Sequence, residues 1–166
     1  MYSRPLVPAD FVVPLRLEGD GFVLRPLTVN DLIKDYDAVM TSADRLVGFM
    51  NPPGTWPRGL TLEEDLIDLG WHQREFTMRH SFAYTVMSPS EEECLGCCYI
   101  LPSDKAGYDA AVYYWARSST LAGGFEERLG AAFRTWIAKD WPFARVAYPG
   151  RDIAWKDWPP KPAYAG

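Results

Sequence analysis

The segment from Tyr108 to Lys139 constrains the fold most, because it joins an apolar strand to an amphipathic helix through a turn that contains glycine. The strand reads YDAAVYYWARSS, the turn reads TLAGG and the helix begins FEERLGAAF. A unit of this kind brings unpaired backbone N–H groups and the positive end of a helix dipole to one place. We therefore expect the turn and the first residues of the helix to suit a phosphate group.

The helix is predicted from apolar residues that recur with the period of an α-helix. Gly124 stands just before its first turn, and Pro142 prevents the helix from continuing. Acidic residues near its start and basic residues near its end complement the helix dipole. The apolar stripe consists of Phe125, Leu129, Ala132, Phe133, Trp136 and Ile137.

The composition indicates one soluble domain with a substantial core. The chain has 166 residues, of which 48% are hydrophobic, 14% aromatic and 23% charged. Residues 1–166 are expected to form this single domain. Within it, residues 1–20 are interrupted by proline and resemble an N-terminal arm, and residues 149–166 form a tail rich in Pro and Trp.

Charge and hydropathy argue against two classes of partner. The net charge is -5 and no Lys/Arg cluster is longer than a pair, so no nucleic acid is expected as a partner. No membrane is expected either, because the chain contains no run of about 20 apolar residues. The N-terminus lacks the pattern of a secretory signal, and we expect a cytoplasmic protein.

The cysteines are expected to be reduced and buried, because Cys94, Cys97 and Cys98 are an odd number crowded into one strand-like run. A metal site would need them to join His72 and His80. A regular strand would point Cys94 and Cys97 to opposite faces, so no metal site is predicted.

The order of elements predicts an α+β fold, with a mixed, mostly antiparallel sheet flanked by helices. Two capping boxes, Thr28 with Asp31 and Thr61 with Glu64, open the first two helices, the second of which ends near Arg79. Strands are expected at residues 22–25, 81–87, 94–101, 109–116 and 145–148.

The chain resembles the GNAT superfamily of N-acetyltransferases from about Gly21 to Tyr148. The resemblance rests on FVLRPLTVNDL at the first strand and helix, LGCCYI in the third strand, and YYWARSSTLAGG at the fourth strand and the loop after it. It implies acetyl-CoA as cosubstrate and direct attack of a small amine on the thioester. An acyl-CoA-dependent N-acetyltransferase acting on a small-molecule amine is the expected function.

The resemblance also implies which residues hold the cofactor. In the family, the pantetheine pairs with the fourth strand, and the following loop and helix N-terminus hold the pyrophosphate. The family's loop has Arg or Gln at the position of Leu121, and Gly or Ala at the position of Glu126. Glu126 therefore places a negative side chain where a diphosphate would approach. The implied cofactor-binding residues are Tyr114, Trp115, Ala116, Arg117, Leu121, Ala122, Gly123, Gly124 and Phe125.

Asp109 is the candidate catalytic base. Many members of the family carry Glu on the fourth strand, where this chain has Ala111. Asp109 shares that strand face and could act through a water. The alternative is a solvated residue at the start of a strand.

The candidate acceptor-binding residues are Trp56, His72 and Tyr113, since an aromatic cleft suits a small amine. The alternative is that these aromatic residues fill a bulky core and line no cleft. Tyr113 and Tyr114 must face opposite sides of the sheet, so both cannot line one pocket.

A second function from a different class stays open, namely a catalytically inactive GNAT-like module that binds a ligand or a protein. The tail is too short for the family's last helix and two strands. Arg151, Asp152 and Trp155 are its functional candidates, against the alternative of a Trp-anchored tail that docks on the core. The oligomeric state, a homodimer included, is left open.

Overall fold

The computed structural model describes residues 4–159. Their six strands form one sheet in the order β1-β2-β3-β4-β5-β6. Its strands are β1 (Leu17–Gly19), β2 (Phe22–Pro26), β3 (Phe82–Met87), β4 (Cys94–Pro102), β5 (Ala110–Ala116) and β6 (Val146–Ala147). The α-helices are α1 (Leu32–Met40), α2 (Ala43–Leu46), α3 (Leu62–Thr77) and α4 (Phe125–Asp140), and the 3-10 helices are η1 (Val29–Asp31), η2 (Ser118–Gly123) and η3 (Trp155–Asp157).

The sheet is antiparallel from β1 to β5, and β6 joins β5 in parallel after the crossover through α4. This arrangement confirms the predicted α+β class with a mixed, mostly antiparallel sheet. The parallel pairing is short, because only Ala110 and Ala111 of β5 pair with Val146 and Ala147 of β6. Beyond Ala111 the outer edge of β5 is therefore not joined to β6.

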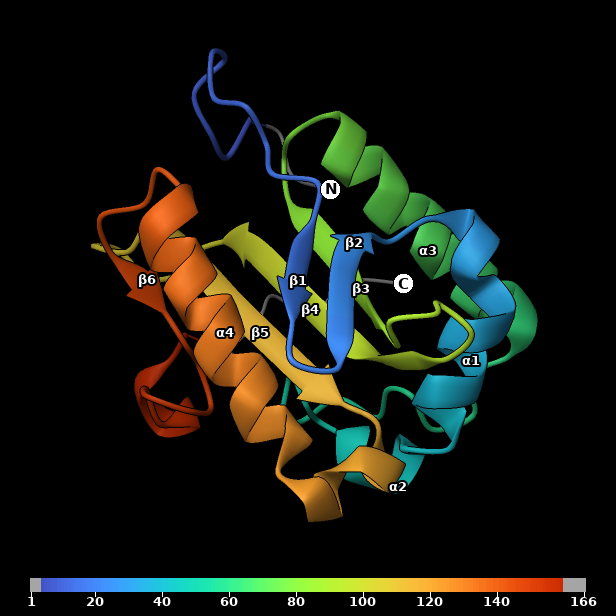
Figure 1. Cartoon of the computed structure of the whole chain (residues 1–166). Helices are drawn as coiled ribbons and strands as arrows, with labels where there is room; N and C mark the ends of the chain where they lie inside the picture. The colour runs from blue at the N-terminus through green and yellow to red at the C-terminus, as the bar shows by residue number, and fades with distance from the viewer. Residues whose placement is uncertain (1–3, 160–166) are drawn as a thin grey trace.

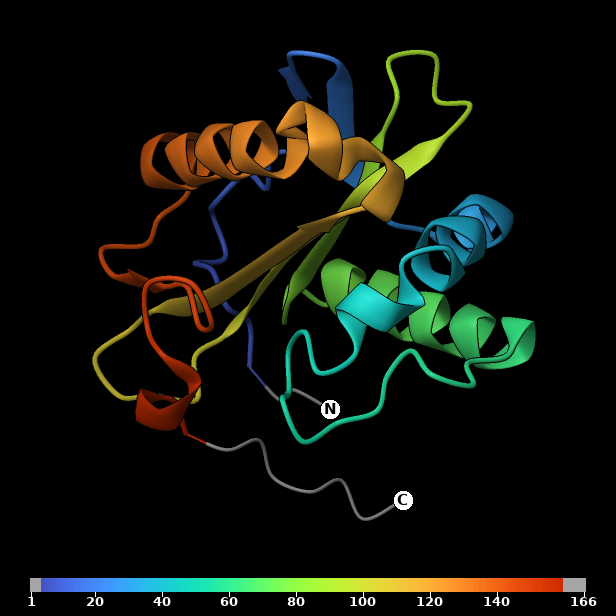
Figure 2. The same cartoon turned by 90° about the horizontal axis from the view of Figure 1, so that it is seen from below.

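Helices cover both faces of the sheet. Figures 1 and 2 show α4 across one face, with α1, α2 and α3 on the other. The α4 face is filled by residues such as Phe22, Tyr84, Tyr114 and Phe133. The opposite face is filled by residues such as Leu69, Tyr99, Tyr113 and Trp115. Tyr113 and Tyr114 thus lie on opposite faces, as their alternation along the strand predicts.

The helices with strong local signals lie where the sequence predicts them. The prediction for α4 is confirmed, as is the capping box of α3, in which the Thr61 hydroxyl accepts from the Glu64 N–H. Two local details differ from the prediction. The expected tight turn after β5 is the 3-10 helix η2, and α2 was not predicted because four residues show no helical period.

Two segments near the termini belong to the body of the fold. Leu17–Gly19, within the expected N-terminal arm, pair with β2 as the edge strand β1. In the tail, Trp158 is buried and the Trp155 ring stacks on that of Tyr113 at 6.4 Å. The Asp152 carboxylate accepts two hydrogen bonds from Arg134 of α4. The described part of the tail therefore docks on the core, and its last residues, 160–166, lie outside the described range.

The prediction that Cys94 and Cys97 point to opposite faces is wrong. An irregularity in the β3–β4 pairing lets Met87 pair with Cys94 while Val86 pairs with Gly96, so the extra residue returns both thiols to the α1/α3 face. Gly96 has φ +155°, and a Cβ there would lie 2.0 Å from the Trp115 carbonyl oxygen. All three cysteines are nevertheless free and buried, as expected.

Among residues 4–159, no group of His, Cys, Asp and Glu side chains could hold a metal ion, and no helix is long and apolar enough to cross a bilayer.

Candidate active site

The candidate site is built where β5 ends and α4 begins. Ala116 is the last residue of β5, η2 follows, and Gly124 precedes α4 in the left-handed conformation with φ +67°. Glycine adopts this conformation without the cost that a side chain would bring. The expected strand, turn and helix N-terminus are therefore all present, and the turn is a short 3-10 helix.

The surface of η2 presents exposed backbone. Ala122 and Gly123 are exposed, and a Cβ built on Gly123 would meet no atom within 4 Å, so a ligand could approach this backbone closely. The first N–H groups of α4 add donors next to Gly124, because the first turn of a helix leaves its N–H groups without intrahelical partners. Three other N–H groups of the segment are already used. Ser118 donates to the Ser42 hydroxyl, Thr120 donates to the Arg117 carbonyl, and Gly124 donates to the Leu121 carbonyl.

The outer edge of β5 is occupied by the protein's own side chains. The N–H of Ala116 donates to Glu126 Oε2 at 3.0 Å, and its carbonyl accepts from Arg45. The carbonyl of Tyr114 accepts from Arg151 Nη2 at 2.9 Å. The Arg151 guanidinium also lies 3.8 Å from the centre of the Tyr114 ring. The backbone expected to pair with a pantetheine is thus closed in this conformation.

Glu126 is the centre of this arrangement. Its Oε1 lies 3.0 Å from Arg151 Nη2 and its Oε2 lies 3.0 Å from Arg45 Nη1. Burial by itself would raise the pKa of Glu126, but the Ala116 N–H and the two guanidinium groups outweigh burial and lower it. Glu126 is therefore a carboxylate at neutral pH. The sequence singles out Glu126 as unfavourable for a diphosphate, and its partners could not be read from the sequence.

Several expected cofactor-binding residues have side chains committed elsewhere. Trp115 is fully buried on the α1/α3 face, where its indole N–H donates to the Tyr99 hydroxyl. Arg117 is buried and donates to the Cys94 carbonyl and to the side chain of Asp37.

Two apolar members of the expected set also face inward. Phe125 is buried against Phe22 with ring centres 5.8 Å apart, and Leu121 packs on the same core. These residues could meet a ligand at the end of β5 through their backbone only.

Asp109 lies at the other end of β5. Its carboxylate oxygen Oδ2 accepts from the N–H groups of Ala144 and Arg145, both at 2.8 Å. Its own N–H donates to the Arg145 carbonyl. The strand rise places it about 20 Å from Ala116. The contacts of Asp109 fasten the turn between α4 and β6.

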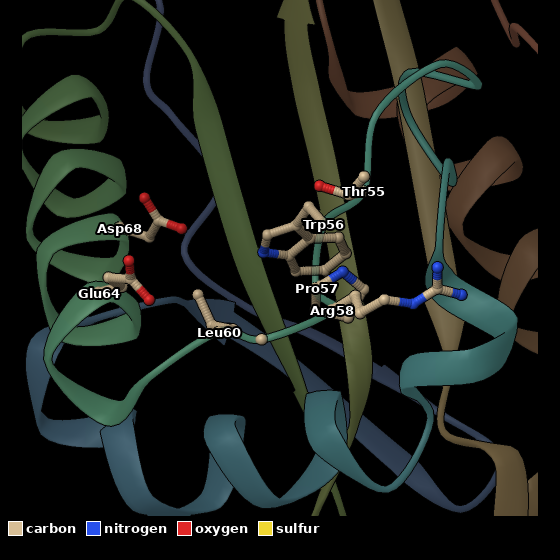
Figure 3. Close-up of a pocket in the computed structure, with 8 residues that line it drawn as sticks. Thr55, Trp56, Pro57, Arg58, Leu60, Glu64 and Asp68 are labelled. Atoms are coloured by element: carbon tan, nitrogen blue, oxygen red, sulfur yellow. The ribbon is translucent and has the colours of Figure 1, made fainter. Parts of the chain in front are cut away.

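A second hollow lies on the α1/α3 side of the sheet, between the loop before α3 and α3 itself. It has a volume of about 350 Å³ and is lined by Thr55, Trp56, Pro57, Arg58, Gly59, Leu60, Glu64 and Asp68. Figure 3 shows Glu64 and Asp68 on the side of α3 that faces the Trp56 indole, and Arg58 directed away from them. Partial burial, and then the neighbouring Glu64 carboxylate, raise the pKa of Asp68.

The other two candidates for acceptor binding, His72 and Tyr113, do not line this hollow. The ring of His72 lies 4.9 Å from that of Trp71 and 5.4 Å from that of Tyr99. Tyr113 packs in the core between Phe49 and Trp155. Of the three predicted acceptor residues, the hollow therefore contains Trp56.

Buried acids next to this region were missed in the sequence. Asp35 of α1 accepts a hydrogen bond from the Cys97 thiol at 3.3 Å. Burial, and then the nearby Asp65 carboxyl, raise the pKa of Asp35 to about 7. Asp65 is 2% exposed, and burial followed by the charge of Asp68 raises its pKa to about 6. The available signal was the position of these acids on the apolar faces of their helices.

Neither the protein-family models nor the curated protein sequences compared with this chain match it. Solved structures do match. The ribosomal-protein-S5-alanine acetyltransferase of Vibrio fischeri has a TM-score of 0.61 at 15% identity, over 76% of this chain and 68% of that one. A ribosomal L7/L12 alpha-N-protein acetyltransferase has a TM-score of 0.60 at 17% identity, over 81% of this chain and 70% of that one.

An acetyltransferase that gives self-immunity to microcin C7 is also similar, and its structure holds acetyl-CoA and AMP. Its TM-score is 0.61 at 11% identity, over 77% of this chain and 68% of that one. A Bordetella pertussis protein named as a putative GNAT-family acetyltransferase matches with a TM-score of 0.54 at 15% identity, over 74% of this chain and 72% of that one. The sheet order, the parallel β6 and the β5–η2–α4 unit agree with these matches, so this chain has the fold of the GNAT acetyltransferases.

Proposed function

We propose that this protein is an acyl-CoA-dependent N-acetyltransferase that transfers an acetyl group directly to an amine. The observation that carries the proposal is the unit formed by β5, η2 and α4. The outer edge of β5 is not joined to β6 beyond Ala111, and it leads to an exposed backbone that ends in the left-handed Gly124. Structural neighbours are acetyltransferases, and two were solved with CoA or acetyl-CoA.

Backbone donors are proposed to bind the diphosphate, with Ala122 and Gly123 nearest to it. Gly124 is proposed to contribute the backbone conformation of the loop, because its own N–H donates to the Leu121 carbonyl. This assignment agrees with the exposure of η2 and does not depend on the Arg or Gln that Leu121 replaces. In the observed conformation the outer edge of β5 cannot pair with a pantetheine, because Glu126 and Arg151 already bind the Ala116 N–H and the Tyr114 carbonyl. No chemical step is therefore assigned to the edge.

The test is calorimetric titration with acetyl-CoA and with CoA at low and at moderate salt, because a diphosphate contribution weakens as salt rises. Gly124→Asp should remove both the binding and the thermal stabilisation by CoA, since it adds a carboxylate at the helix start. Gly124→Asn is the matched control, because Asn tolerates the same backbone conformation without the charge. Equal binding by Gly124→Asp and Gly124→Asn would contradict the site.

The acceptor is proposed to be a cationic small-molecule amine bound in the hollow beside Trp56. Glu64 and Asp68 provide negative charge, and an indole face attracts a cation. Two neighbours are named as ribosomal-protein acetyltransferases, so a protein α-amine is the other arm of an acceptor screen. Asp68→Asn should raise KM for the amine several-fold, whereas Glu63→Gln on the solvent side of α3 should leave it unchanged.

A catalytically inactive module is the second candidate, and the closed edge of β5 favours it. Asp109 stays the proposed base only through a water, and its two backbone contacts give it a second, structural role. Release of the CoA thiol from acetyl-CoA only when an amine is added would support the acetyltransferase over the inactive module. Binding of CoA without turnover over the full screen would favour the inactive module. A cytoplasmic location remains part of the proposal.

A further inference from the structure

The closed edge of β5 is a compact arrangement of charged groups drawn from four parts of the chain. Glu126 is in the first turn of α4, Arg45 is in α2, Arg151 is in the tail, and Ala116 ends β5. Both oxygens of the Glu126 carboxylate are used, Oε1 by Arg151 and Oε2 by Arg45 and the Ala116 N–H. The Glu126 side chain is 16% exposed, so these contacts are partly shielded from water.

The tail holds Arg151 in place through a tight turn. The N–H groups of Arg151 and Asp152 donate to the Tyr148 carbonyl, and Pro149 bridges to Ile153. Asp152 fastens the turn to α4 by its double contact with Arg134. Since Arg151 and Asp152 are neighbours, the contact to Arg134 positions Arg151 over the edge.

We propose that Glu126 and Arg151 form an intramolecular latch, which stands in for the bound pantetheine and must open before acyl-CoA can pair with β5. This inference rests on the proposed function. In the closed state, the Glu126 carboxylate takes the Ala116 N–H and the Arg151 guanidinium takes the Tyr114 carbonyl. These are the backbone groups that an extended amide ligand would otherwise use.

Opening the latch also changes which charges face the ligand. When Glu126 leaves Ala116, Arg45 and Arg151 lose their shared carboxylate partner and become available to an anion. A ligand with a diphosphate can replace that carboxylate, whereas a neutral amide cannot. The latch therefore favours ligands that carry both an extended amide chain and a diphosphate, which is the chemistry of CoA.

The latch is tested by measuring Kd for CoA in the full chain with Glu126→Ala and with Glu127→Ala. Glu127 is the matched control, because it is exposed and carries the same charge one residue further along the same helix. Charge-assisted hydrogen bonds must break before the wild type can bind, so Glu126→Ala should bind about tenfold more tightly. Glu127→Ala removes the same charge close to Gly124, so any gain in its affinity measures net charge alone and should stay well below that of Glu126→Ala.

Two further measurements keep the outcome decisive. Glu126→Gln keeps the size of the side chain but cannot form the two ion pairs, so it should also bind more tightly if Glu126→Ala folds poorly. Amide exchange without ligand should become faster at Ala116 in Glu126→Ala and stay unchanged in Glu127→Ala.

The two ways of failing are distinct. Measurable CoA binding with the same Kd in the wild type, Glu126→Ala and Glu126→Gln would overturn the latch and leave the proposed function standing. An equal gain in Glu127→Ala would also overturn the latch, because only net charge would then matter. The absence of CoA binding in every variant would overturn the latch and the proposed function together.

Discussion

The buried carboxyl of Asp35 should make the protein less stable as the pH rises from about 5 to about 8. Asp35 is 4% exposed, and it faces the Cys97 thiol with the acids Asp65, Asp31 and Asp68 nearby. Burial is the main cause that raises its pKa from 3.8 to about 7. At pH values between these two pKa values, the folded protein therefore holds a proton on Asp35 that the unfolded chain releases.

The loss of stability with rising pH follows from this difference in proton binding between the folded and the unfolded chain. The stabilising effect of the protonated Asp35 is fully present below the unfolded pKa, and it is lost as pH rises through the folded pKa. Each unit of pKa difference corresponds to about 1.4 kcal/mol, so the whole difference amounts to about 4 kcal/mol. Cys97 does not add to the change in this range, because its thiol pKa is raised well above 9.0 by Cys94, by burial and by Asp35.

The assay is urea unfolding of the wild type and of Asp35→Asn at several pH values. Asn keeps an oxygen that can accept from the Cys97 thiol and does not titrate, so its curve should lack the part of the loss that Asp35 causes and keep the smaller part that Asp65 and Asp68 cause. The difference between the two proteins should grow in favour of Asp35→Asn by about 2 to 4 kcal/mol over this pH range. Parallel curves would refute the reasoning.

Asp31→Asn is the control with the opposite sign. Burial alone would raise the pKa of Asp31, but hydrogen bonds from Arg25 and Thr28 lower it. Asp31 therefore adds stability above its unfolded pKa, and this stability is lost as pH falls through the folded pKa. Asp31→Asn should lower stability evenly from about pH 5 to pH 8 and change the pH dependence only at lower pH.

Three further changes test the packing that supports the site. Gly96→Ala should destabilise the sheet by at least about 2 kcal/mol in thermal unfolding, because its Cβ would lie 2.0 Å from the Trp115 carbonyl oxygen; a stability equal to the wild type would contradict that close approach. Phe133→Ala should lower the free energy of unfolding by about 3 to 5 kcal/mol in urea, because Phe133 of α4 is fully buried in the core between the helix and the sheet; a loss below about 1 kcal/mol would mean that the α4 face is loosely packed. Asp109→Ala should lower the melting temperature through the lost contacts to Ala144 and Arg145, and an unchanged melting temperature with lost acetyl transfer would assign it to catalysis alone.

Much of the fold could be predicted because its signals are local. The apolar stripe of α4 and the capping box of α3 involve residues within one or a few turns of a helix, so the sequence shows them directly. The opposite orientation of Tyr113 and Tyr114 follows from the alternation along a strand. The strand β5, the helix α4 and a glycine-containing connection between them were predictable for the same reason, whereas the 3-10 helix η2 in that connection was not.

The sequence did not show how the chain would occupy that site. Arg45 contacts Ala116 across 71 residues and Arg151 contacts Glu126 across 25 residues. The irregularity at Gly96, which turns Cys94 and Cys97 to one face, depends on the pairing of β4 with β3. Sequence by itself determined the longer helices, the strands from β2 onward and their order, because periodicity and capping act over a few residues. Tertiary structure alone decided that the edge of β5 is closed, because that contact requires α2, α4 and the tail to meet.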